Sequence, residues 1–362
     1  MKNKYVVFLI SAVALLILPL VFQQAGNFWV RILDFALLYV LLALGLNIVV
    51  GYAGLLDLGY VAFYAVGAYC LGLLASPQLT ESFAAIRSSF PQGIHLWVWV
   101  VIPIAAALAG LAGVLLGAPT LKLRGDYLAI VTLGFGEIIR VFINNLDSPI
   151  NITNGPKGIG QIDSFHLFGF NFGKTHEFFG IDFNSVTMYY YLFLALVVFS
   201  VMICYRLERS RIGRAWMAIR EDEIAAKAMG INTRNMKLLA FGMGATFGGV
   251  SGVLFATFQG FISPESFSLQ ESIMIVAMVV LGGIGHIPGV ILGALLLSAL
   301  PEVLRWVSGQ FDLQMITGGR LDAAILRQLL IAVAMIAIML IRPRGLWPSP
   351  EHGKAAPTPA SK

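Results

Sequence analysis

Long apolar runs recur from one end of the chain to the other, each separated from the next by a polar segment. A run of about 20 apolar residues is long enough to cross a bilayer as a helix. The hydrocarbon interior holds no water, so the backbone N–H and C=O groups of such a run must bond within a helix. Only 12% of the 362 residues are charged, against about 25% in soluble globular chains. The sequence therefore predicts an all-α, polytopic integral membrane protein.

Ten apolar runs are expected to be transmembrane helices. They cover residues 5–22, 28–50, 58–75, 96–118, 127–146, 187–205, 238–258, 269–281, 290–307 and 324–341. The eighth run is short and leads into the glycines that follow it. We expect one transmembrane domain, residues 1–346, and a tail of small and polar residues, 347–362, that is disordered and cytoplasmic.

The basic residues favour one orientation of the ten spans. If the N-terminus is cytoplasmic, an even number of spans returns the C-terminus to the cytoplasm. Sixteen Lys and Arg residues then lie in cytoplasmic segments and seven in outside segments or at span edges, as the positive-inside rule requires. Half of the sixteen lie in one cytoplasmic segment, 206–237, and the longest outside segment is 147–186. Because the basic residues lie in loops between spans, the net charge of +5 does not indicate nucleic-acid binding.

Segment 206–237 combines its basic residues with an acidic cluster at 221–223. Three of its apolar residues fall at helical spacing: Ile212, Trp216 and Ile219. We expect a short amphipathic helix along the membrane surface, with Glu223 able to pair with Lys227. A solvated loop that only sets topology and a helix that binds lipid headgroups are alternatives. Neither explains an acidic cluster within a basic segment, whereas a complementary protein surface does.

Two glycine-rich segments interrupt the apolar runs, 51–59 after the second and 282–289 after the eighth. They are interpreted either as broken helices whose free backbone groups line a pathway, or as close helix packing followed by a tight turn. The sequence leaves both interpretations open. The candidate path residues here are Gly51, Gly54, Asp57, Gly282 and Gly285.

The fifth run carries Glu137 and Arg140 on one helical face, which Asn144 extends by one turn. Ionisable residues inside a membrane usually face the bundle interior or a water-filled path. This face is therefore a candidate lining for the route of a polar solute. A structural ion pair between Glu137 and Arg140 is the favoured alternative, and such a pair can still border the path.

A weak internal similarity links residues 110–115 to residues 249–254, which suggests a possible duplication without fixing its register. The five histidines are scattered, and none lies at a metal-ligand spacing from Cys or Asp. Cys70 and Cys204 lie in apolar runs and are expected to be unpaired thiols. No metal, no cofactor and no catalytic residue is expected.

Five stretches together resemble the permease subunit of bacterial branched-chain amino acid ABC importers, of the LivM type. They are residues 51–59, 123–140, 153–158, 218–226 and 342–346, and they follow the expected order along nearly the whole chain. The resemblance implies a multi-pass protein of the bacterial inner membrane that carries leucine, isoleucine and valine. A sister permease would complete the pore, two cytoplasmic ATP-binding subunits would power it, and a periplasmic solute-binding protein would deliver the solute.

The resemblance also implies an ATPase-coupling role for part of segment 206–237. Residues 223–230 are similar to the E-A-A-x-x-x-G coupling signature of importer permeases, although one extra residue separates Glu223 from the alanines. The coupling residues carried over are Arg220, Glu221, Asp222, Glu223, Ala225, Ala226 and Gly230. Ten spans with this loop between the sixth and the seventh are also similar to the larger, vitamin-B12-type importers.

The expected mechanism is that ATP binding closes the partner ATPases, moves the 206–237 helix and thereby tilts the broken-helix segments. This chain is not expected to hydrolyse ATP itself. The alternative is an ion-coupled secondary transporter or channel for a small polar solute, which would use Glu137 or Asp57 and no ATPase. A membrane-embedded enzyme is disfavoured because no catalytic set is visible.

Overall fold

A computed structural model of the chain describes residues 2–121, 123, 125–167, 169–178, 181–310, 329, 332–333, 336–337, 340–341 and 345–347. Helices follow the first nine apolar runs in this part of the chain. They are α1 (Lys2–Ala25), α2 (Asn27–Asn47), α3 (Val61–Leu74), α6 (Val98–Thr120), α7 (Asp126–Asn144), α8 (Ser185–Glu208), α11 (Thr233–Gln259), α12 (Leu269–Gly282) and α13 (Ile287–Gln310). The tenth run, 324–341, and the tail after residue 347 lie mostly or wholly outside the described residues.

Five helices among the described residues are long and apolar enough to cross a membrane. They are Asn27–Tyr52, Val98–Thr120, Ser185–Glu208, Thr233–Gln259 and Pro264–Gly282. Three shorter apolar helices accompany them, at Val13–Gln24, Val61–Leu74 and Ile287–Val303. These helices confirm a mostly helical, multi-pass membrane protein. The count of ten spans and the orientation stay predictions.

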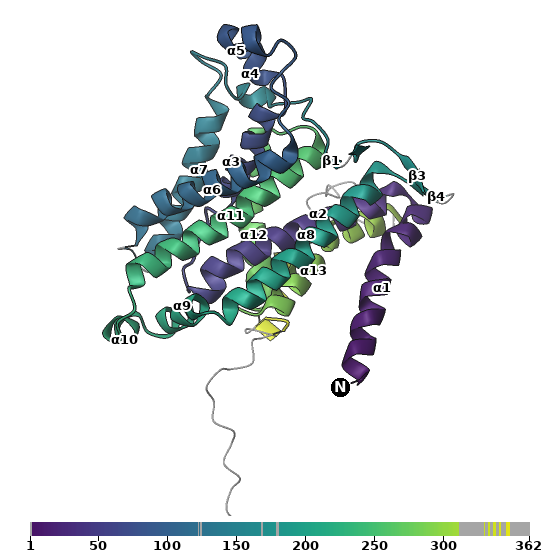
Figure 1. The fold of residues 1–362 in the computed structure, drawn as a ribbon. Helices are drawn as coiled ribbons and strands as arrows, with labels where there is room; N and C mark the ends of the chain where they lie inside the picture. The colour runs from purple at the N-terminus through teal and green to yellow at the C-terminus, as the bar shows by residue number, and fades with distance from the viewer. Residues whose placement is uncertain are drawn as a thin grey trace, which may run out of the picture.

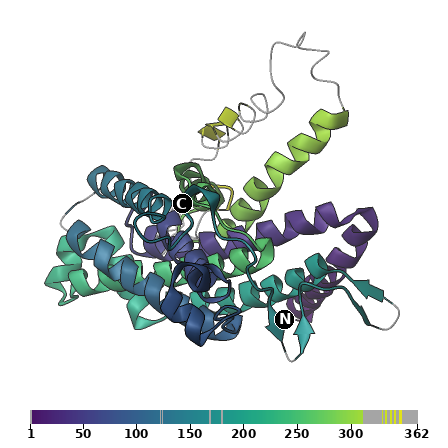
Figure 2. The ribbon, with the colours of Figure 1, turned by 90° about the horizontal axis from the view of Figure 1, so that it is seen from above.

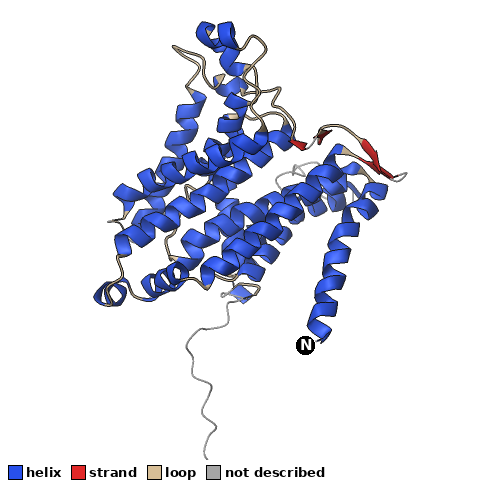
Figure 3. Ribbon diagram, viewed as in Figure 1, coloured by secondary structure: helices blue, strands red, loops and turns tan. Residues whose placement is uncertain are grey.

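The polar loops contain short elements that the sequence did not predict. Helices α4 (Gln78–Ser82) and α5 (Ala84–Ser89) follow α3, and the 3-10 helix η2 (Gly155–Lys157) begins the long loop after α7. That loop also holds two antiparallel hairpins, built from β1 (His166–Leu167), β2 (Phe170–Asn171), β3 (His176–Phe178) and β4 (Ile181–Phe183) (Figure 3). The expected all-α chain is therefore mostly helical with a small β component. Strands of two or three residues are too short to show an alternating pattern.

Close packing around α11 forms the middle of the bundle, where α11 lies alongside both α3 and α6 (Figures 1 and 2). A Cβ added at Gly252 on α11 would lie 2.1 Å from the carbonyl oxygen of Tyr64 on α3. On the other side, a Cβ at Gly113 of α6 would lie 2.6 Å from that of Ala245. The small residues of both similar stretches thus allow close helix contact, which requires no duplication to explain it.

The helices differ in how much of their surface the chain itself covers. In the most apolar stretch of the helix that begins with α2, 78% of the residues are buried by the rest of the chain, whereas in that of α6 only 28% are buried. The core also includes the buried rings of Tyr60, Phe193 and Phe267. Helix α2 is therefore central, and α6 keeps a large apolar surface for lipid or another subunit.

The loops gather at two opposite ends of the bundle (Figure 1). At one end, the segment between α8 and α11 contacts the chain after α2, and Leu346 donates its N–H to the Leu281 carbonyl at 2.8 Å. At the other end, Ile159 in the long loop forms an isolated antiparallel bridge with Ile262 after α11. This grouping matches the two sets of segments that the sequence places on opposite sides of the membrane. Which end faces the cytoplasm stays a prediction.

The contact at Gly252 leads to a test of the packing. A Gly252→Val substitution should clash with the α3 backbone and lower the free energy of unfolding by about 1–3 kcal/mol, because overpacked helices must move apart. The matched control is Gly134→Val on α7, where an added Cβ meets nothing within 4 Å. Melting temperatures of the purified variants in detergent provide the measurement. Equal melting temperatures would contradict the packing described here.

Candidate functional site

The polar segment between α8 and α11 folds into two short helices, α9 (Arg211–Glu221) and α10 (Glu223–Ala228). Ser210 caps α9, its Oγ accepting the Gly213 N–H at 3.1 Å. Asp222 caps α10, its Oδ1 accepting the N–H groups of Ile224 at 2.7 Å and Ala225 at 3.0 Å. The sequence predicted one amphipathic helix here. The Asp222 cap instead ends α9 and starts α10 in a new direction, because an N-cap residue has a non-helical backbone.

The apolar face of α9 packs onto the first turns of α11. Trp216 is fully buried, and its indole Nε1–H donates to the Met236 carbonyl at 2.7 Å. Ile219 is buried as well, and Ile212 is half-buried. A tryptophan that anchored the helix in lipid headgroups would instead be exposed in the isolated chain. The predicted apolar stripe therefore makes an intramolecular packing contact with α11.

An ion pair ties α10 to α11. The Lys237 Nζ lies 2.7 Å from the Glu223 Oε1, and the lysine side chain is only 6% exposed. The sequence suggested Lys227, on the same helix, as a partner for Glu223. The ion pair with Lys237 joins Glu223 to a different helix, α11, and was not predicted. A buried ammonium needs a counter-charge, so Glu223 holds α10 in place against α11.

Arg220 connects α9 with both glycine-rich segments. Its Nη1 donates to the Gly51 carbonyl at 2.5 Å. A Cβ at Gly285 would lie 2.8 Å from that same nitrogen, and a Cβ at Gly54 would lie 2.9 Å from the arginine Cγ. Both glycines have positive φ angles, +81° and +68° respectively, so a side chain there would be strained as well as crowded. The resemblance assigned Arg220 to ATPase coupling, which stays a prediction, and the sequence contained no signal for its contact with the glycine-rich segments.

The two glycine-rich segments meet each other at this end of the bundle. Helix α2 continues as a π-helical turn, Ile48–Tyr52, after which the chain is non-helical until α3. Gly285, between α12 and α13, donates its N–H to the Asn47 Oδ1 at 2.9 Å. Trp347, at the start of the predicted tail, donates its N–H to the Gly282 carbonyl at 3.1 Å. The two glycine-rich segments therefore lie in one place, and a role for them in lining a path stays a prediction.

Asp57 is buried within the first of these segments. Its Oδ1 accepts the Gly59 N–H at 2.9 Å, while its Oδ2 has no hydrogen-bond partner among the described residues. The neighbouring Leu58 N–H donates to the Thr132 Oγ1 of α7 at 3.0 Å. Asp57 thus stabilises the turn that leads into α3, and its role in a solute path stays a prediction.

Helix α7 presents an open, mostly apolar hollow with one ion pair at its edge. The Arg140 Nη2 lies 2.9 Å from the Glu137 Oε2, and both side chains are about one-third exposed, at 35% and 32%. The hollow is lined by Glu137, Ile138, Val141, Phe142 and Asn145. The predicted ion pair is therefore present, but the polar amide that lines the hollow belongs to Asn145 rather than to Asn144.

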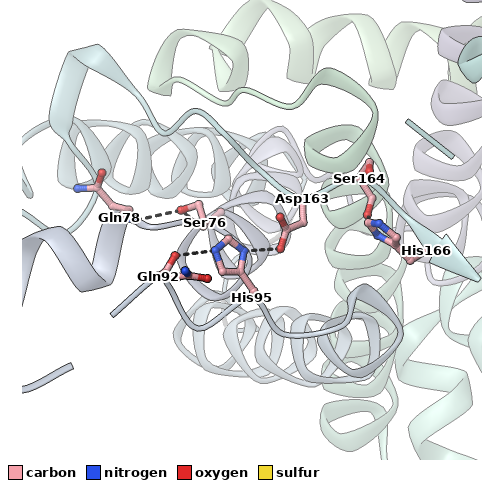
Figure 4. Close-up of polar contacts among 8 residues, drawn as sticks. Ser76, Gln78, Gln92, His95, Asp163, Ser164 and His166 are labelled. Carbon is pink, nitrogen blue, oxygen red and sulfur yellow. Dashed lines mark hydrogen bonds and ion pairs between the residues drawn. The ribbon is translucent and has the colours of Figure 1, made fainter. Parts of the chain in front are cut away.

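At the opposite end of the bundle, His95 joins two polar loops (Figure 4). Its Nδ1 lies 2.7 Å from the Asp163 Oδ2, and its Nε2 lies 2.8 Å from the Gln92 carbonyl oxygen. These hydrogen bonds, first that with Asp163, raise the pKa of His95 above its usual value. The loop before α6 is thereby held to the long loop after α7. No sequence spacing links two residues so far apart.

The described residues contain no group of three or more His, Cys, Asp or Glu side chains that could hold a metal ion. Cys70 and Cys204 are buried free thiols. In the described residues, two short helices are held to α11, and one arginine of α9 lies against both glycine-rich segments.

Residues 28–339 match the family model described as the permease component of the branched-chain amino acid transport system. The chain belongs to this family. It is 42% identical over 93% of its length to the Escherichia coli (strain K12) high-affinity branched-chain amino acid transport system permease protein LivM, covering 74% of that protein. The LivH permease protein of the same organism is 26% identical, over 87% of this chain and 93% of that protein.

Another relative is the probable branched-chain amino acid transport permease protein LivM of Methanocaldococcus jannaschii, 27% identical over 86% of this chain and 90% of that protein. No solved structure matches the chain. The greater identity to the Escherichia coli LivM than to LivH confirms the LivM-type resemblance that the sequence motifs carried.

The His95–Asp163 contact predicts a pH dependence. The unfolded-state pKa of histidine is about 6.5, and the folded-state pKa is raised, so the contact contributes its full stability below pH about 6.5. That contribution is lost as pH rises through the folded-state pKa. Because both side chains are partly exposed, we expect at most about 1 kcal/mol. Melting temperatures measured from pH 5 to 9 should show this loss for the unmodified chain and not for Asp163→Asn. The same pH profile in both proteins would contradict it.

Proposed function

We propose that this chain is the LivM-type permease subunit of an ATP-driven importer for leucine, isoleucine and valine in a bacterial inner membrane. Family membership and the printed names of the relatives support the transported class. The proposed coupling mechanism is based on the contact of Arg220 with Gly51, Gly54 and Gly285. In this proposal, the end of the bundle that bears α9 and α10 faces the cytoplasm.

The α9–α10 unit has the connections that a transmission lever needs. The Trp216 hydrogen bond and the Lys237–Glu223 ion pair hold it to α11. The Arg220 hydrogen bond holds it to Gly51 at the end of α2, and the Gly285–Asn47 hydrogen bond joins that end of α2 to the segment between α12 and α13. A force on α10 is therefore passed to the interrupted helices, which alternates access to the path in the proposed cycle.

Two ATP-binding subunits would power the cycle, one of them docking on this chain through α10. Ile224 and Met229 are 72% and 83% exposed, which is unusual for apolar side chains in a polar loop. Gly230 follows at a φ of +84° and lets the chain turn away after the helix. Glu221 is exposed and free to face the partner, whereas Asp222 and Glu223 already have partners within the chain. We therefore assign docking to Glu221, Ile224 and Met229, and shaping of the helix to Asp222 and Glu223.

A sister permease would cover the hollow on α7 and complete the path. Ile130, Ile138 and Phe142 are more than 60% exposed along this helix, at 64%, 62% and 65%. The Glu137–Arg140 pair borders the hollow, so a polar solute could pass it without meeting a net charge. A periplasmic solute-binding protein would dock on the outer loops that His95 and Asp163 join.

An ion-coupled transporter that acts alone is not favoured. Glu137 is paired with Arg140, and the Asp57 carboxylate caps a turn. The matching family is also one of transport-system components. Uptake of labelled leucine into vesicles, with and without ATP and the ATP-binding subunits, tests the proposed function directly. Uptake that needs neither would overturn it.

Docking through α10 predicts a loss of assembly. Ile224→Ser combined with Met229→Ser should remove most of the exposed apolar contact and reduce co-purification of the ATP-binding subunits by about tenfold or more, the effect of losing about 1.4 kcal/mol or more. Arg234→Ser, exposed on the first turn of α11, is the control. Co-purification at the unmodified level in the double variant would exclude α10 as the docking helix.

The Arg220 contact predicts uncoupling without loss of assembly. Arg220→Gln removes a hydrogen bond from a charged donor, a contribution of about 1.5–3 kcal/mol. We expect leucine uptake per ATP hydrolysed to fall about tenfold or more while the ATP-binding subunits still co-purify. Arg214→Gln on the same helix, whose side chain bonds only to the nearby Arg209 carbonyl among described residues, should leave coupling intact. If Arg220→Gln keeps normal coupling, the lever mechanism is wrong.

A further inference from the structure

A cavity of about 400 Å³ opens between α2, α12 and α13, a different group of helices from the one that holds the α7 hollow. Its lining runs from Phe28 and Arg31, near the start of α2, to Tyr39, about 12 Å further along that helix at 1.5 Å per residue. Trp29 and Trp306 pack edge to face beside this end of the helices, with ring centroids 6.3 Å apart. Tryptophans gather at membrane–water interfaces, so the cavity extends from the outer interface toward the middle of the membrane.

The cavity is lined by equal numbers of acidic and basic side chains, among apolar ones. The charged residues are Arg31, Glu271, Glu302 and Arg305, and the apolar ones include Met274, Met278 and Leu297. Arg305 pairs with Glu302 on the same helix at 3.0 Å. Arg31 and Glu271 come from different helices and form no ion pair with each other in the described part of the chain.

Arg31 and Glu271 are each held in place by a hydrogen bond, and each keeps further hydrogen-bonding atoms for a ligand. The Arg31 Nη2 donates to the Gln259 Oε1, and the guanidinium carbon lies 5.5 Å from the centre of the Phe258 ring. A guanidinium has five N–H donors, so donors remain for a ligand. The Glu271 Oε2 accepts the Tyr39 hydroxyl at 2.8 Å, which leaves its Oε1 available. Separate charges of both signs inside a membrane are costly unless they have a partner or a function.

We propose that this cavity binds a zwitterion with an aliphatic part: a primary ammonium on Glu271, an anionic group on Arg31, and the aliphatic part against Met274, Met278 and Leu297. A purely anionic or cationic ligand would be repelled by one member of the pair. The volume lies within the range of small-molecule sites.

Two sources supply this chemistry. One is a free aliphatic amino acid, in which an ammonium lies next to a carboxylate. The other is an aminophospholipid, in which an ammonium lies near a phosphate and the acyl chains extend along the bundle. The amino-acid source rests on the proposed transport function, whereas the lipid source is independent of it.

The first arm of the test uses the full chain, assembled with its partner subunits, in nanodiscs of phosphatidylcholine. The trimethylated headgroup of this lipid has no N–H to donate to Glu271. L-leucine is titrated by calorimetry in the absence of any solute-binding protein. If the amino acid is the ligand, Glu271→Gln and Arg31→Gln should each weaken binding about tenfold or more. Glu265→Gln, exposed and outside the cavity, should not change the affinity.

The second arm uses the same assembly in nanodiscs that contain equal amounts of phosphatidylethanolamine and phosphatidylcholine. Native mass spectrometry then counts the lipid that stays bound. If the lipid is the ligand, phosphatidylethanolamine should be retained over phosphatidylcholine, and both cavity variants should lower that preference about tenfold or more. Melting temperatures check that the variants are folded, and Arg31→Lys, which keeps a positive charge, should retain part of the binding.

Binding in either arm that depends on both Glu271 and Arg31 supports the zwitterion site and identifies its source. Two results overturn the proposal: neither ligand binds, or binding is unchanged in both cavity variants. The lipid arm measures no transport. Its result can therefore be interpreted even if the proposed importer function proves wrong.

Discussion

A buried backbone N–H or C=O group needs a hydrogen-bond partner, and the rest of this structure depends on how the chain meets that constraint where its helices stop. At the end of α2 the Gly51 carbonyl accepts the guanidinium of Arg220. Across the gap, the Gly285 N–H donates to the Asn47 side chain. The backbone groups at these two places thus find hydrogen-bond partners in each other's segments and in a side chain from the polar segment. Because that segment supplies one of the partners, it cannot move without affecting the interruption.

This arrangement gives each part of the α9–α10 unit a distinct role. Trp216 and Glu223 face inward and connect the unit to α11. Ile224 and Met229 face outward with nothing covering them in the isolated chain. Arg220 leads to the glycines. The acidic cluster at 221–223 divides in the same way, since Asp222 and Glu223 shape the unit and Glu221 faces solvent. Carboxylates that already bond within the chain are poorer candidates for contacts with a partner than Glu221.

Much of the candidate site could be predicted from local pattern. The Glu137–Arg140 pair follows from i, i+3 spacing, and the buried stripe of Trp216 and Ile219 follows from helical periodicity. The break at Asp222 was missed because an N-cap inside an amphipathic run looks like another polar position of the helix. Asn144 was chosen because it lies one turn after Arg140, whereas the hollow is lined by Asn145, which directly follows the last residue of α7. The hairpins of the long loop after α7 were missed because strands of two or three residues are too short to show an alternating pattern.

The sequence by itself determined that the chain is a helical membrane protein, where its helices lie and which family it belongs to. Those properties follow from the length of apolar runs and from motifs that are contiguous along the chain. Only the tertiary structure decided that segments 51–59, 218–226 and 282–289 meet at one arginine, or that Arg31 and Glu271 line one cavity. Contacts between residues so far apart depend on how the helices pack, and no spacing in a single sequence records that packing.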